Sequence, residues 1–430
     1  MQKTTVIPIV AALSLTTACF SPDRGSMEPG GESTGMTTSA SDDSAGPASS
    51  ATTGSQGDAS TDDGTPQPDT GAQTSDDGGT TAVTTVADES GESGESGDSS
   101  GDTGQAVIRA DIYVDAATGN DGNDGSLGAP KQTITAGLAI ATSGDVVAVF
   151  PGQYDAPHGE LFPIDVGASV TLVGDPEHRG VGATSTRILG NGMIDNDNSA
   201  AVELHNGAEI RGFAITSSSD LLSFGVYVAV DATIAENTFD FSYGGVRLAG
   251  GGSHTEMNTF ETNSYGVYGC DGGTGVVSDN HFITPALPVD IRGGGSCDVI
   301  DNLIEGNGQV GMQNQGGANL VAGNTFDQPT GYTYGCFSGG AGAMLRDNDC
   351  NVATGMAIRV TGSQTLDLGT AGDLGGNILG TNNAVGIVVL DSADVHAMGN
   401  TWANGGVTCG VDIELQGTGS VTYGAMQTCG

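Results

Sequence analysis

Residues 107–430 of this 430-residue chain are predicted to form a right-handed parallel β-helix. Three observations predict this fold: a repeat with a period near 22 residues, short alternating apolar strands between glycine turns, and an asparagine that recurs at one position of the repeat. The chain contains 73 glycines. So many glycines without a G-X-Y period indicate many turns rather than collagen.

The recurring asparagine follows the pattern apolar–x–x–Asn–x–apolar. Its members are Asn237, Asn258, Asn280, Asn302, Asn324, Asn348, Asn377 and Asn400. Strands of successive coils lie about 4.8 Å apart, so each side-chain amide can donate to and accept from the next coil. The sequence therefore predicts a structural asparagine ladder at a buried turn. Leucine-rich repeats also use such a ladder, but their L-x-x-L-x-L pattern and helical segments are missing here.

The first part of the repeat region carries a distinctive set of residues. They are Tyr113-Val114, Gly119-Asn120-Asp121, Asp124-Gly125, Pro130, Thr133-Ile134, Ala139, Gly144-Asp145 and Pro151-Gly152-Gln153-Tyr154. Together they resemble the entry motif of an uncharacterised family in the pectin-lyase-like β-helix superfamily. The resemblance implies the fold and says little about function, because this scaffold hosts many functions. Residues 133–142 are predicted to form a short helix, ending near Gly144, that covers the open first coil.

Residues 1–19 are predicted to be a lipoprotein-type signal peptide. Lys3 precedes an apolar run at 6–15, which ends in Thr16-Thr17-Ala18-Cys19. This end resembles a bacterial lipobox, which implies lipidation of Cys19; an ordinary cleaved signal peptide is the alternative. Phe20, rather than Asp, follows the cysteine, and for a lipoprotein this implies the outer membrane or cell surface. We therefore expect an exported protein.

Residues 20–106 consist mainly of Ser, Thr, Gly, Asp and Glu. Their apolar residues are too sparse to offset chain entropy, so the segment is predicted to be a disordered stalk that acts as a spacer. No other apolar stretch is long enough to span a bilayer. Membrane contact is therefore expected only through the N-terminal lipid anchor.

The net charge of −41 limits the expected partners. It excludes nucleic acid, since affinity for phosphates needs Lys and Arg. It also disfavours unassisted binding of polyanions, so neutral glycans, cations or proteins are easier partners. The alternative is that the acidity only keeps an exported protein soluble. We expect a monomer.

A second repeated pattern, Gly–apolar–x–apolar, predicts an outward-facing stripe. Its first outward column is Tyr227, Arg247, Tyr268, Asp290, Gln313 and Phe337, and the next column holds Arg292, Gln315 and Arg359. Aromatic and planar polar groups at this spacing suit stacking on, and hydrogen bonding to, sugar rings. The predicted function is non-catalytic binding of an extracellular or cell-envelope polysaccharide or another surface partner. The alternative reading of the stripe is cross-strand pairing that stabilises an exposed sheet.

Two other functions stay open. One is a polysaccharide lyase or glycoside hydrolase with a divergent site, in which Asp290 would be the plausible acid or base. The N-T-D, D-D and G-H-G motifs of glycoside hydrolases on this scaffold, and the Arg-x-Pro-x-x-Arg signature of pectate lyases, are absent from residues 107–430. The other is a purely structural surface protein.

The loop at residues 120–125 contains Asp121 and Asp124, which are weak calcium candidates. A calcium ion needs six to eight oxygens, and this loop offers only a few, so an ordinary Asn/Asp/Gly turn is the competing interpretation. No cofactor is expected to be required.

Six cysteines remain apart from Cys19, and an even number in an exported chain predicts disulfides. Six cysteines allow fifteen pairings. Their positions in the repeat favour Cys270–Cys297, Cys336–Cys350 and Cys409–Cys429.

Overall fold

The computed structural model describes residues 109–261, 264–283, 285–305, 308, 310–316, 319–328, 334–340, 342–352, 355–380 and 385–430. The predicted signal peptide with Cys19, and the predicted stalk at 20–106, lie outside the described residues. Within the described residues, no helix is long and apolar enough to cross a membrane.

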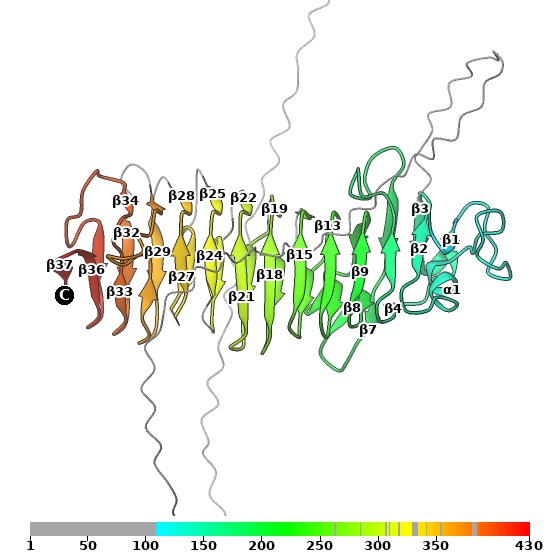
Figure 1. Cartoon of the computed structure of the whole chain (residues 1–430), viewed down its shortest axis with the longest axis horizontal. Helices are drawn as coiled ribbons and strands as arrows, with labels where there is room; N and C mark the ends of the chain where they lie inside the picture. Colours follow the sequence, from blue (N-terminus) through cyan, green and yellow to red (C-terminus); the bar gives the residue numbers. More distant parts are fainter. Residues whose placement is uncertain are drawn as a thin grey trace, which may run out of the picture. The chain divides into compact units, whose positions relative to one another are not determined.

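The described residues form a parallel β-helix with three long sheets of 14, 11 and 12 strands (Figure 1). The strands pair in parallel with their counterparts in the neighbouring coils, as β14 does with β11 and β17, except that β7 and β37 pair antiparallel with β8 and β36. Figure 1 shows these coils stacked along one axis, from β1 and α1 at one end to β37 at the other. The predicted fold class is confirmed.

The three sheets contain the following strands. The 14-stranded sheet holds β1 (Ile112–Val114), β2 (Val146–Val149), β5 (Thr171–Val173), β9 (Ala208–Arg211), β12 (Ala232–Ala235), β15 (Ser253–Glu256), β18 (Thr274–Ser278), β21 (Ser296–Ile300), β24 (Leu320–Ala322), β27 (Met344–Arg346), β30 (Leu366–Asp367), β33 (Asp394–His396), β36 (Ser420–Gly424) and β37 (Gln427–Cys429). The 11-stranded sheet holds β3 (Gly152–Asp155), β6 (Thr186–Leu189), β10 (Ala214–Thr216), β13 (Thr238–Asp240), β16 (Thr259–Phe260), β19 (His281–Phe282), β22 (Leu303–Glu305), β25 (Thr325–Gln328), β28 (Asp349–Val352), β31 (Ile378–Leu379) and β34 (Thr401–Trp402). The 12-stranded sheet holds β4 (Ile164–Val166), β7 (Gly192–Met193), β8 (Ser199–Leu204), β11 (Ser223–Val228), β14 (Gly244–Leu248), β17 (Tyr265–Gly269), β20 (Leu287–Ile291), β23 (Met312–Asn314), β26 (Phe337–Gly339), β29 (Met356–Val360), β32 (Val385–Val389) and β35 (Ile413–Leu415).

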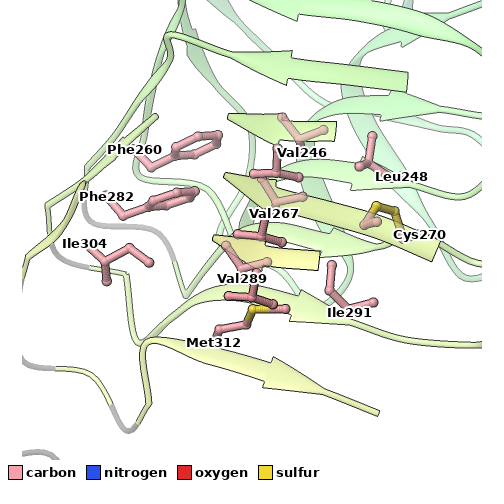
Figure 2. Close-up of a cluster of buried hydrophobic side chains, with 14 of the residues drawn as sticks. Val246, Leu248, Phe260, Val267, Cys270, Phe282, Val289, Ile291, Ile304 and Met312 are labelled. Atoms are coloured by element: carbon pink, nitrogen blue, oxygen red, sulfur yellow. A yellow bond between two sulfur atoms is a disulfide. The ribbon is translucent and has the colours of Figure 1, made fainter. Parts of the chain in front are cut away.

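The core lies inside the coils, where like side chains stack from one coil to the next. Figure 2 shows Val246, Val267 and Val289 in one such stack, with the Phe260 and Phe282 rings beside them. The two rings lie 4.7 Å apart between centroids and are inclined by 8°. This stacking follows from the in-register pairing of parallel strands at a spacing of about 4.8 Å.

The glycine of the second repeated pattern makes room for these rings. A Cβ atom added at Gly266 would overlap the Phe282 ring, and one added at Gly245 would meet the Phe260 ring at 2.5 Å. The 12-stranded sheet therefore needs glycine where the phenylalanines of the 11-stranded sheet fill the interior.

The asparagine ladder is present as predicted. Asn280 accepts hydrogen bonds at Oδ1 from the backbone N of Asn258 at 3.0 Å and from its Nδ2 at 3.1 Å. The Asn280 Nδ2 donates to the Thr255 carbonyl at 2.8 Å and to Asn302 Oδ1 at 3.0 Å. The same arrangement continues to Asn400, so the ladder joins eight coils through buried turns.

The N-terminal helix is shorter than the predicted segment 133–142. Helix α1 spans Ile134–Leu138, and Thr133 caps its N-terminus by accepting a bond from the Ala136 N at 3.1 Å. After Leu138 the backbone bonds reach back only three residues, from Ile140 to Gly137 and from Ala141 to Leu138. Asp145 then accepts bonds from the backbone N and the hydroxyl of Thr142 where the chain turns toward β2. A one-turn 3-10 helix, η1, spans Ala156–His158.

The three predicted cysteine pairs are joined as disulfides. Their Cα–Cα distances are 6.2 Å for Cys270–Cys297, 5.7 Å for Cys336–Cys350 and 5.8 Å for Cys409–Cys429. All three distances lie within the usual range for disulfides. The last pair ties β37, which pairs antiparallel with β36, to the final coil.

Candidate functional site

The predicted stripe lies on the outer face of the 12-stranded sheet. Strand register aligns Tyr227, Arg247, Tyr268, Asp290 and Gln313 in one column, as the sequence predicted. We call this column, with its continuation through Ser338 to Arg359, the binding column, after the function predicted for it from the sequence.

Two residues do not occupy their predicted positions. Phe337 pairs with Met312 and is fully buried in the core, so Ser338 takes the outward position. Arg359 pairs with Ser338 and therefore belongs to the first column, not the second. For Phe337 the reason is one additional residue before β26, because Cys336, rather than Gly335, aligns with the repeat glycine of the previous coil. A one-residue shift moves a side chain to the other face of its strand. For Arg359 the offset is two residues, because Ala357, rather than Gly355, aligns with the repeat glycine Gly386 of the next coil, so Arg359 stays outward but changes column.

The centre of the binding column is a tyrosine held between two arginines. The guanidinium carbons of Arg247 and Arg292 lie 5.0 Å and 4.6 Å from the Tyr268 ring centroid. Arg247 pairs with Asp271, and Arg292 donates from Nε and Nη2 to Asp290 Oδ2 at 2.8 Å and 2.7 Å. We call these five residues the Tyr268 clamp. A sugar would have to compete with the two arginines to stack on the Tyr268 ring.

Asp290, the predicted acid or base, has a fully buried side chain. Burial raises the pKa of its carboxyl, and the neighbouring Arg292 opposes that rise. Its second oxygen lies 3.5 Å from Gln315 Nε2. In this arrangement Asp290 orients Arg292, whose side chain is 36% exposed, and does not itself reach the solvent.

Sequence reasoning missed an aromatic group beside the clamp. The Tyr265 ring lies 5.2 Å from the Tyr243 ring and 5.1 Å from the Tyr268 ring, and Phe224 lies beneath them, 5.6 Å from Tyr268. Burial raises the pKa of Tyr243 and of Tyr268. A signal was present, because the tripeptide Ser-Tyr-Gly recurs at 242–244 and 264–266.

The far end of the column carries a second arginine–tyrosine contact. The Arg359 guanidinium carbon lies 4.4 Å from the Tyr334 ring centroid, and Arg359 Nη1 lies 3.4 Å from Ser338 Oγ. Sequence reasoning missed Tyr334 because it lies in the coil whose register is shifted. Gln313 is half-buried and Gln315 is exposed between the two arginine groups. This part of the face thus presents mainly hydrogen-bond donors.

Acidic residues border the other end of the column. Glu203 pairs in register with Tyr227, and burial raises the pKa of its carboxyl. Asp195 lies in the hairpin between β7 and β8, where its carboxylate accepts bonds from Asn198. These bonds lower the pKa of Asp195.

The loop predicted as a weak calcium site uses its carboxylates for local hydrogen bonds. Asp121 accepts from the backbone N of Gln132 and Thr133, each at 2.9 Å, and Asp124 accepts from the backbone N of Ser126 at 2.9 Å. Among the described residues, no group of three or more His, Cys, Asp or Glu side chains could hold a metal ion. The turn interpretation of this loop accounts for both aspartates.

Comparison with known protein families identifies the chain. The model of a family described as "Protein of unknown function (DUF1565)" matches residues 117–407. The chain belongs to this family. The match confirms the expectation, drawn from the entry motif, of an uncharacterised family. No curated protein is significantly similar to the chain.

Three solved structures are similar to the chain at low sequence identity. The complex of XylC with xylose has a TM-score of 0.39 and 8% identity, covering 71% of this chain and 69% of that chain. Pectate lyase Pel9A has a TM-score of 0.30 and 15% identity, covering 73% of this chain and 76% of that chain. ORF18 of Geobacillus virus E2 has a TM-score of 0.31 and 15% identity, covering 73% and 61%.

Proposed function

We propose that the outer face of the 12-stranded sheet binds a polysaccharide without cleaving it. The observation that carries this proposal is the Tyr268 clamp, which continues into a row of donors formed by Gln313, Gln315 and Arg359. In a chain this poor in basic residues, three arginines on one face of one sheet form a local concentration of donors.

The chemistry of the row suits sugar oxygens. A guanidinium group presents five N–H donors in a fixed plane, and a glutamine amide adds both a donor and an acceptor. The half-buried rings of Tyr243 and Tyr265 add apolar surface beside these donors. Successive rows lie about 4.8 Å apart, so an extended chain along the axis of the coils would meet one polar row after another.

The position of Asp290 supports binding rather than cleavage. Glycoside hydrolysis usually needs a pair of carboxyl groups on either side of the scissile bond. Between Arg247 and Arg359, the column itself holds one carboxylate, Asp290, which is buried under Arg292. The second carboxylate of the clamp, Asp271, is 34% exposed and is paired with Arg247. Each of the two carboxylates therefore serves to orient an arginine donor.

The N-terminal part of the chain supports a proposed location for this face, outside the cell membrane. A lipid on Cys19 would anchor the chain, and the acidic segment 20–106 would hold the β-helix away from the membrane. In this proposal the protein is a surface-displayed monomer that binds a cell-envelope or extracellular polysaccharide.

A glycan-array screen of the purified full chain tests the proposal. It should include reducing-sugar and unsaturated-product assays on every bound glycan, with and without calcium. We expect binding without products, and we expect Arg292→Gln to weaken it. Arg187→Gln is the matched control, because Arg187 also pairs with an aspartate and is 42% exposed, but lies on the 11-stranded sheet. Products from any glycan, or equal effects of both variants, would contradict the proposal.

A further inference from the structure

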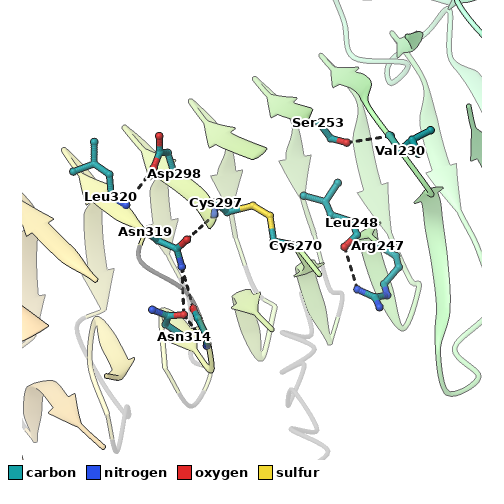
Figure 3. Close-up of a disulfide and its surroundings, with 11 residues drawn as sticks. Val230, Arg247, Leu248, Ser253, Cys270, Cys297, Asp298, Asn314, Asn319 and Leu320 are labelled. Carbon is teal, nitrogen blue, oxygen red and sulfur yellow. Dashed lines mark hydrogen bonds between the residues drawn. A yellow bond between two sulfur atoms is a disulfide. The ribbon is translucent and has the colours of Figure 1, made fainter. Parts of the chain in front are cut away.

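The Cys270–Cys297 disulfide lies directly behind the Tyr268 clamp. Cys270 follows the last residue of β17, two positions after Tyr268, and the side chains of Cys270 and Cys297 are both buried. Cys297 belongs to β21 of the 14-stranded sheet in the following coil. Figure 3 shows the disulfide on one side of this turn and Arg247 with Leu248 on the other. The bond thus ties the corner between the two sheets to the next coil.

Three N–H donors at the turn after Cys270 bind one carbonyl oxygen. The Leu248 carbonyl accepts from the backbone N of Cys270 at 2.7 Å, from the backbone N of Asp271 at 3.4 Å and from Arg247 Nη1 at 3.2 Å. Asp271 then pairs with the other terminal nitrogen of Arg247. The backbone fixed by the disulfide is therefore the backbone that orients the Arg247 guanidinium.

The packing around this turn leaves little freedom. Cys270 has a positive φ of 78°, which is uncommon for a residue with a side chain. A Cβ atom added at Gly269 would overlap Arg247 Nη1, and one added at Gly295 would overlap the Cys270 carbonyl. Arg247 lies against one glycine of the turn, and the next coil closes over the turn from the other side.

We propose that the Cys270–Cys297 disulfide is a positioning element of the binding column. It fixes the turn that carries Asp271 and thereby holds Arg247 against the Tyr268 ring. This inference rests on the proposed function, because it assigns the disulfide a role in ligand binding. The disulfide itself does not touch the ligand.

The reactivity of Arg247 toward phenylglyoxal, mapped by mass spectrometry, tests the inference without any ligand. In the full-length Cys270→Ala/Cys297→Ala variant, phenylglyoxal is expected to modify Arg247 several-fold faster than in the wild type. Arg346 is the internal control, since its side chain is 11% exposed and pairs with two aspartates, close to the 14% exposure of Arg247. An unchanged rate at Arg247, or an equal acceleration at Arg346, overturns the inference, because the first shows no positioning and the second shows general loosening.

Two further variants separate positioning from stability. Cys409→Ala/Cys429→Ala removes a disulfide at the far end of the coils and should leave the Arg247 rate unchanged. Asp271→Asn keeps all three disulfides and should accelerate the modification of Arg247, while Asp271→Glu should restore part of the protection. If Asp271→Asn has no effect, the inference fails even where the double cysteine variant does not fold.

Gel electrophoresis through xylan, mixed-linkage β-glucan, galactomannan or polygalacturonate adds the binding readout. The Cys270→Ala/Cys297→Ala variant is expected to be retarded less than the wild type. The Cys409→Ala/Cys429→Ala variant is expected to be retarded as much as the wild type. Equal retardation of all three, with a faster Arg247 reaction, would overturn the role in binding and leave the proposed function intact. A wild type that no polysaccharide retards would count against the proposed function, and Arg247 reactivity would then decide the positioning by itself.

Discussion

The asparagine ladder should carry a large share of the stability of the middle coils. In Asn280→Ala, the buried backbone N of Asn258 loses its acceptor, and the Thr255 carbonyl loses the Asn280 Nδ2 donor. Asn258 and Asn280 are at most 1% exposed, so water cannot replace these partners. Each buried polar group left without a partner costs about 1–3 kcal/mol, so the free energy of unfolding should fall by about 2–6 kcal/mol.

Urea unfolding followed by circular dichroism measures this loss, with Asn400→Ala as the matched control. Asn400 makes the same kind of bonds at the end of the ladder, but it is half-buried, so water can satisfy the groups that the substitution exposes. The control should therefore lose clearly less stability than Asn280→Ala. If the two variants lose the same amount, or if Asn280→Ala loses less than about 1 kcal/mol, the energetic role assigned to the ladder is wrong.

Two other predictions concern the core and the clamp. Gly266→Ala should lower the free energy of unfolding by about 1–3 kcal/mol, because the new Cβ overlaps the Phe282 ring. Thermal melts measure this loss. The control Gly406→Ala should change the melting temperature little, because a Cβ there meets nothing within 4 Å. Asp290 should make stability depend on pH, because its pKa is raised in the folded state above the unfolded value of about 3.9. The folded state then binds more protons between the two pKa values, so the stability of the wild type relative to Asp290→Asn should fall as pH rises through this window and stay level above it. Urea titrations at several pH values check this, and a relative stability that rises with pH would contradict it.

The sequence predicted the frame of the molecule well because the frame depends on a local repeat. An asparagine such as Asn280 recurs at a fixed interval, and its partners are the same residue type one coil away. The cysteine pairs were predictable for a similar reason, since the repeat indicates to which coil each cysteine belongs and whether its side chain points inward. The helix at α1 was predicted in the right place, but its end was not, because the backbone bonds after Leu138 reach back three residues instead of four.

The binding column was predictable only as far as the repeat stayed regular. From Tyr227 to Gln313 the coil length is nearly constant, so counting residues identified the outward positions. One additional residue before β26 moved Phe337 into the core, and an offset of two residues before β29 moved Arg359 into the first column. In a strand the side-chain direction alternates at every residue, so a single insertion reverses the assignment.

The sequence by itself determined the parallel β-helix, the asparagine ladder, the cysteine pairing and the sheet face on which arginines and tyrosines collect. Only the tertiary structure decided what those side chains do there. It buried Asp290 under Arg292, brought Asp271 to Arg247 and gave the Tyr268 ring two guanidinium partners. Such contacts join residues of different coils, and the exposure of each group depends on how its neighbours in those coils pack, which a repeat pattern does not specify.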